Sequence, residues 1–210
     1  MTPNLTAHRH LTKTLAALLL AGLAPLTLVA QESAQHLFEA GRYDAALARV
    51  AEERAGGQDS LESTFIAAQA AHRLADAGRA IEEYERIAGS PNPAWAALGR
   101  AGAALERGDV DTAQAAASEA VQLEDGLGFA HYTLGLVHAR RNNHEAAAQS
   151  FARAAESTPG FAYAHYYAGL AFQRVRNLNR TANHFEQFLQ LAPDAPERGA
   201  VLAVLRSIRG

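Results

Sequence analysis

A recurring pair of positions organises most of the chain. A small residue is followed four places later by an apolar or aromatic one, and successive copies begin 34, 33, 34 and 34 residues apart: Ala46/Val50, Ala80/Tyr84, Ala113/Ala117, Ala147/Phe151 and Thr181/Phe185. Residues four apart share one face of a helix, so each copy predicts an amphipathic helix. Self-similarity at this period is typical of helix-turn-helix units that stack because each unit alone is too small to bury its apolar face.

The copy over residues 128–161 shows both helices of one unit. Its first helix carries residues at i, i+3, i+4 and i+7, which form one face: His131, Leu134, Gly135 and His138. Gly135 and Ala147 leave room where the two helices approach, and Phe151 fills the space between layers. Ala154 and the closing Pro159 complete the unit. Residues 162–195 and 61–94 repeat this arrangement.

These copies resemble the tetratricopeptide repeat (TPR) over roughly residues 34–195, with histidines in place of two of its usual aromatics. The resemblance implies an all-α, right-handed α-solenoid of about five repeats, at about 31–60, 61–94, 94–127, 128–161 and 162–195. The turns inside the repeats fit, with Gly41, Gly108 and Asn142 between paired helices and Asp44, Asp111 and Asn143 as expected N-caps.

Two copies depart from the pattern. Trp95, Leu98 and Gly99 look like a first helix, but Trp95 lies 18 residues before Ala113 whereas His131 lies 16 before Ala147, which leaves that helix register open. The first repeat has a good second helix and a first helix that must be short or frayed.

Residues 196–210 predict a C-terminal helix that covers the last repeat. Asp194, followed three residues later by Glu197, predicts a helix start with a capping box. The apolar stripe of this helix follows: Val201, Leu202, Val204, Leu205 and Ile208.

Residues 1–30 predict a signal peptide. Arg9 and Lys13 precede an apolar run that ends at Ala30, the expected cleavage point. The run of roughly 16 residues is shorter than the ~20 of a spanning helix, which favours a periplasmic product without stable membrane insertion over an inner-membrane anchor.

Charge and composition exclude several classes of function. The formal charge is −3, and the first thirty residues hold two cations and no acid, so the remainder carries −5 and nucleic acid is not an expected partner. The chain has no cysteine, which excludes disulfides, thiolate metal sites and cysteine nucleophiles.

Nine histidines invite a metal or catalytic interpretation. His131, His138 and His165 occupy packing positions, no pair has the i, i+4 spacing of a zinc helix, and no acidic residue joins them in the sequence pattern. Phosphate loops, nucleophile elbows and zinc-protease motifs are absent from the sequence. We therefore expect no enzyme activity, no metal and no cofactor.

A second stripe on the first helices predicts a binding groove. In proteins similar to this one, that side lines a concave peptide-binding surface, and aromatic rings beside guanidinium groups suit a peptide with acidic or aromatic side chains. The candidate residues are Phe65, Arg73, Phe129, Tyr132, Leu136, Arg140, Tyr163, Tyr166, Leu170 and Arg174. The alternative is that these aromatics are buried against neighbouring helices or the chain's own N-terminal segment.

The sequence thus favours a scaffold for protein or peptide partners, with a role as adaptor or assembly factor in the bacterial envelope. A self-associating subunit is the first alternative, as a homodimer through Trp95, the aromatic stripe or the terminal helix. An enzyme or small-molecule binder is a more remote one. Repeat scaffolds serve many pathways, so fold does not name the partner.

Overall fold

A computed structural model describes residues 32–58 and 60–210 of the chain. Within these ranges it contains eleven α-helices and no strand. The helices are α1 (Ala34–Glu39), α2 (Tyr43–Ala55), α3 (Leu61–Arg73), α4 (Ala77–Ala88), α5 (Pro93–Glu106), α6 (Val110–Leu123), α7 (Gly128–Arg140), α8 (His144–Ser157), α9 (Ala162–Arg174), α10 (Leu178–Leu191) and α11 (Arg198–Arg209). The predicted signal peptide lies outside the described residues.

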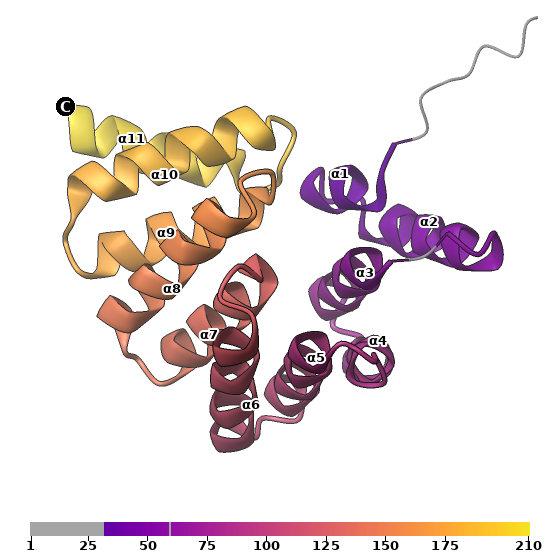
Figure 1. Cartoon of the computed structure of the whole chain (residues 1–210). Coiled ribbons are helices and arrows are strands. Elements are labelled where there is room, and N and C mark those ends of the chain that lie inside the picture. Colours follow the sequence, from indigo (N-terminus) through magenta and orange to yellow (C-terminus); the bar gives the residue numbers. More distant parts are fainter. Residues whose placement is uncertain (1–31, 59) are drawn as a thin grey trace, which may run out of the picture. The chain divides into compact units, whose positions relative to one another are not determined.

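Consecutive helices form five antiparallel pairs, each packed on the next (Figure 1). The pairs are α1/α2, α3/α4, α5/α6, α7/α8 and α9/α10, and α11 follows against α10. The expected all-α solenoid is confirmed, and α1, at six residues, is as short as the sequence predicts. In the part of the chain that the structure describes, no helix is long and apolar enough to cross a membrane.

The turn inside each pair bends at one left-handed residue. These residues are Gly41, Ala75, Gly108, Asn142 and Arg176, whose φ angles lie between 58° and 78°. Gly41, Gly108 and Asn142 stand where the sequence predicts the turns, whereas Ala75 and Arg176 adopt a conformation that L-residues with a Cβ disfavour.

Two of the expected N-caps are wrong. Asp44 and Asp111 lie inside the first turns of α2 and α6, and Asp109 caps α6 by accepting from the Thr112 N–H at 3.1 Å. Asn143 is at the N-cap position of α8 but makes no side-chain cap bond. The cap falls immediately after the left-handed residue, because the chain re-enters the helix there.

Glycines let the paired helices approach, as expected for repeats four and five. A Cβ on Gly135 would lie 2.7 Å from the Phe151 ring, and one on Gly169 would lie 2.5 Å from the Phe185 ring. Both distances are far below van der Waals contact, so an added methyl group forces the aromatic ring to move.

The structure also resolves the register of the third repeat. Ala101, not Gly99, is buried against Ala113 and Ala117 of α6, and Ala101 lies one 34-residue step before Gly135. A Cβ on Gly99 would instead lie 2.3 Å from the Ala88 backbone nitrogen. Gly99 therefore serves the contact with the preceding repeat, where α5 meets α4.

The terminal helix starts later than its sequence pattern predicts. Helix α11 begins at Arg198, and its N-cap residue Glu197 makes no side-chain capping bond. The predicted capping box with Asp194 is therefore wrong, because the Glu197 carboxylate is bound elsewhere, as shown below. Val201 and Leu205 are buried, which agrees with a covering role for this helix.

Candidate functional site

The first helices of several repeats meet in an aromatic cluster. We call this the inner cluster: Phe38, Phe65, Phe129, Tyr132, Phe161 and Tyr163, each at most 5 % exposed. The ring of Phe65 in repeat two lies 4.7 Å from Phe129 in repeat four, between centroids, and Phe129 lies 5.4 Å from Phe161. A regular solenoid places each repeat against its immediate neighbours only. Here repeat two also packs directly against repeat four.

A polar chain borders the inner cluster. The Gln69 amide donates to the Tyr84 hydroxyl at 2.5 Å, and the Tyr132 hydroxyl donates to the Gln69 carbonyl oxygen at 3.3 Å. Burial raises the pKa of both tyrosine hydroxyls above its ordinary value. Both phenols therefore stay neutral, and their hydrogen bonds satisfy groups that would be costly to bury alone.

Beside this chain an open pocket of about 300 Å³ lies along the C-terminal ends of α3, α5 and α7. We call it the side pocket, and its lining residues are Gln69, His72, Tyr84, Leu105, Glu106, Tyr132, Leu136, Ala139, Arg140 and Tyr167. His72 Nδ1 lies 2.9 Å from a Glu106 carboxylate oxygen at the edge. The pocket thus combines aromatic and aliphatic walls with an acid and an arginine.

The ten predicted groove residues divide into three groups. Phe65, Phe129, Tyr132 and Tyr163 are buried, so the structure places them in the interior rather than on an open surface. The half-buried residues are Arg73, Leu136, Tyr166 and Leu170, and the exposed ones are Arg140 and Arg174. Only Tyr132, Leu136 and Arg140 line the side pocket. Burial against neighbouring helices, the alternative kept open by the sequence, describes the first group.

Arg73 is engaged by the chain's own C-terminal turn. Its Nη1 donates to Glu197 Oε1 at 2.9 Å, and its guanidinium carbon lies 4.6 Å from the centre of the Tyr163 ring. The Tyr163 hydroxyl donates to the other Glu197 oxygen at 2.9 Å. The guanidinium expected to face a partner thus already holds a carboxylate.

The histidines are packed, but they have partners that the sequence analysis missed. His131 Nε2 lies 2.9 Å from the Asp125 carbonyl oxygen and 3.2 Å from its carboxylate, so the expectation that no acidic residue joins these histidines is wrong. The Nδ1 atoms of His165 and His184 lie 3.2 Å apart. Among residues 32–58 and 60–210, no group of three or more His, Asp or Glu side chains is placed to hold a metal ion.

The residues missed at this face share one property. Gln69, Glu106, Tyr167 and Glu197 come from repeats or turns whose 34-residue equivalents carry other residue types. A search for repeated residues therefore passes over them. An aromatic residue one position after Tyr166 was the one available signal, at Tyr167.

The surfaces proposed for a homodimer are also mostly interior. Trp95 is 7 % exposed, and its ring lies 5.9 Å from Phe129. Of the three surfaces, α11 retains partly exposed apolar residues at Leu202, Val204 and Ile208. Self-association stays a prediction.

The helix pairs, their spacing and their packing define the chain as a protein with the tetratricopeptide-repeat fold. It is similar to TTC0263, a TPR protein of Thermus thermophilus, with a TM-score of 0.59 and 18 % identity over 82 % of this chain and 95 % of that one. It is also similar to the TPR2AB domain of yeast Sti1 in complex with pHSP90, with a TM-score of 0.50 and 14 % identity over 84 % and 83 % of the two chains.

A further similar structure is the first TPR of Spaghetti (RPAP3) bound to the HSP90 peptide SRMEEVD, with a TM-score of 0.50 and 16 % identity over 56 % of this chain and 93 % of that one. No family model and no curated protein matches the sequence. At these identities the likeness shows the fold alone.

Proposed function

We propose that the chain is a protein-interaction scaffold that binds a polypeptide segment at the side pocket. The carrying observation is the pocket itself, an open volume of about 300 Å³ that gathers side chains from four repeats' helices and contains the predicted Tyr132, Leu136 and Arg140. A segment crossing it would bury apolar atoms against Leu105 and Leu136 and place polar groups near Glu106 and Arg140. Two similar folds, RPAP3 and Sti1, were solved with HSP90-derived partners.

We propose no catalytic role for the same pocket. The His72 and Glu106 pair resembles a general base with its orienting carboxylate. However, no serine, threonine or cysteine is among the residues that line the pocket, so the pair has no hydroxyl or thiol nucleophile to activate. A carboxylate beside an arginine and aromatic walls suits recognition of a mixed polar and apolar segment.

Filling the pocket tests the proposal. Ala139 is exposed in the pocket wall, and Gln173, 34 residues later, is its exposed equivalent outside the pocket. A peptide selected from a random display library against the mature chain should bind Ala139→Trp about tenfold or more weaker than wild type, which is ~1.4 kcal/mol. Gln173→Trp should bind as wild type does. Equal loss in both variants, or in neither, would reject the pocket as the binding site.

We further propose that the scaffold works in the bacterial envelope as an adaptor or assembly factor, after export by residues 1–30. The support is the charged and apolar pattern of that segment in the sequence. Alkaline phosphatase fused behind residues 1–30 should be active in a bacterial host, because the enzyme needs an oxidising compartment for its disulfides. An inactive fusion that is present at normal abundance would contradict export.

A further inference from the structure

The turn between α10 and α11 brings Glu197 to the face built by α3 and α9. Both carboxylate oxygens are bound, one by Arg73 and one by the Tyr163 hydroxyl, each at 2.9 Å. The side chains of Arg73 and Glu197 are 23 % and 13 % exposed. Such a partly desolvated pair is stronger than a surface ion pair, and it ties the C-terminal turn to repeat two across 124 residues of sequence.

Glu197 is not used by its own helix. A residue at an N-cap usually accepts a bond from the next backbone N–H groups, and the Glu197 side chain makes none. Its backbone carbonyl accepts from the Val201 N–H at 3.0 Å, as any N-cap carbonyl does. The carboxylate is therefore free to serve the face of α3 and α9.

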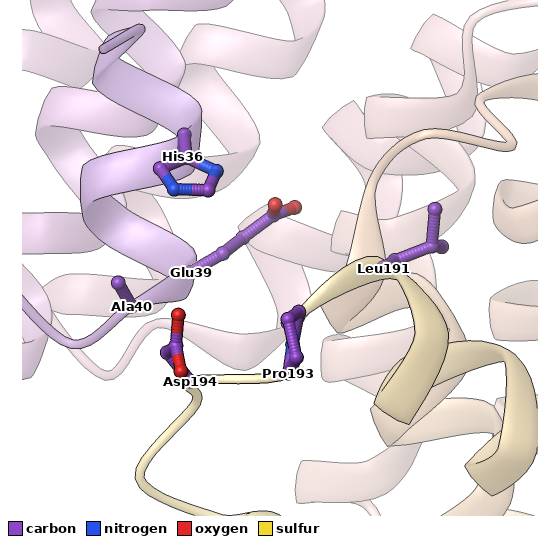
Figure 2. A pocket seen from close by; sticks show the side chains of 7 residues that line it. His36, Glu39, Ala40, Leu191, Pro193 and Asp194 are labelled. Carbon is purple, nitrogen blue, oxygen red and sulfur yellow. The ribbon is translucent and has the colours of Figure 1, made fainter.

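Helix α1 closes over the same region from the other end of the array. The Glu39 carboxylate accepts from the Ala162 N–H at the start of α9 at 2.9 Å, and the Phe38 ring lies 4.9 Å from Tyr163. Figure 2 shows α1 facing the end of α10, with His36 and Glu39 opposite Leu191 and Pro193. The gap between them is about 10 Å³, room for about one water molecule.

The guanidinium of Arg73 is only partly used. Its Nη2 is buried and has no hydrogen-bond partner within residues 32–58 and 60–210. A carboxylate in its best geometry binds both terminal nitrogens of an arginine side by side. Glu197, shared between Arg73 and Tyr163, takes one of them, so a less constrained carboxylate has an unused donor to gain.

We propose that Glu197 is an internal competitor for a partner's acidic side chain. Its carboxylate occupies a subsite, made by Arg73 and Tyr163, that takes an aspartate or glutamate of the bound segment. This inference rests on the proposed function, since Arg73 directly follows His72 of the side pocket and a segment there extends to the subsite. A tethered competitor acts at an effective concentration of roughly millimolar, so dilute acidic segments are excluded until the turn moves.

The chain's own turn supplies a probe. A synthetic peptide of residues 192–200, with sequence APDAPERGA, is titrated into the mature protein and followed by NMR, beside the same peptide with glutamine in place of its glutamate. Because the internal carboxylate is gone, the glutamate peptide should bind Glu197→Gln about tenfold tighter than wild type. The glutamine peptide should bind neither protein measurably. Adding Arg73→Gln should abolish binding of the glutamate peptide.

A matched control uses another glutamate that pairs with the terminal helix. Glu186 of α10 forms an ion pair with Arg209 away from the subsite, so Glu186→Gln should bind the peptide as wild type does. Pro196→Gly loosens the turn and keeps every charged group, and it should give an intermediate gain. This variant decides the question if Glu197→Gln folds poorly.

Equal binding of the glutamate peptide to wild type and to both turn variants would overturn the inference, as would equal binding of the two peptides. The outcome is separate from that of the proposed function. If no displayed peptide responds to Ala139→Trp, the side pocket fails as a partner site, while the added turn peptide still reports on the Arg73 subsite.

Discussion

Repeats four and five carry matching residues at positions 34 apart, and the structure gives them different surroundings. Tyr132 in repeat four is 1 % exposed, and its ring lies 5.1 Å from Phe161 and 6.0 Å from Phe65 of repeat two. Its equivalent Tyr166 is half-buried and packs on α10, with its ring 5.1 Å from Phe188. One tyrosine joins distant repeats, and the other stays within its own.

The histidines of the two repeats differ in the same way. His131 of repeat four bonds to Asp125 in the turn before its helix, whereas His165 of repeat five faces His184 of its partner helix. Equivalent positions therefore differ in function because a solenoid residue has two sets of neighbours. Contacts within the repeat follow the repeat unit, and contacts across the face depend on which other repeats reach it.

The largest expected difference between the repeats is in stability. Tyr132→Ala should lower the free energy of unfolding by about 3–5 kcal/mol, the range for a fully buried large aromatic, and it also leaves Gln69 without a donor. Tyr166→Ala should cost roughly half as much, because its ring is partly in solvent. Urea denaturation of both variants, followed by far-ultraviolet circular dichroism, checks this order. Equal losses would show that repeat two does not pack on repeat four.

A smaller difference should appear as the pH falls. Burial, His165 and Arg180 lower the pKa of His184 from its ordinary 6.5 to about 4, and burial lowers the pKa of His165 as well. Glu156 opposes this shift and Arg180 adds to it. The unfolded chain therefore binds more protons than the folded one between these values, so stability is present above pH 6.5 and is lost as the pH falls toward 4.

Because both rings are partly exposed, solvent screening reduces the loss to about 1–2 kcal/mol between about pH 7 and pH 5. Denaturation of wild type and His184→Gln at both pH values measures it. The variant should lose less stability than wild type over this interval. A pH dependence that is the same in the two proteins would show that the histidine pair is not its source.

The sequence predicts what the repeat unit determines. The helix pairs, the turns at Gly41, Gly108 and Asn142 and the contact of Gly135 with Phe151 follow from local periodicity and side-chain size. The third register escapes prediction because α5 carries small residues at both Gly99 and Ala101, and packing on α4 decides which one faces α6.

Contacts across the face could not be predicted in the same way. Phe65 and Phe129 are separated by 64 positions, and whether they touch depends on the rise and rotation between stacked repeats, which small packing differences accumulate. The same holds for Arg73 and Glu197. The candidate site was therefore correct in three pocket residues, Tyr132, Leu136 and Arg140, and could not separate these from the buried rings.

The central claim is that the first helices of repeats two and four are in direct contact. An NMR experiment on phenylalanine-labelled protein tests it, because the Phe65 and Phe129 ring centroids lie 4.7 Å apart, within reach of a nuclear Overhauser effect. We predict a cross-peak between the two rings, assigned by its loss in Phe65→Leu. A spectrum in which both rings are assigned and show cross-peaks only within their own and adjacent repeats would contradict the account.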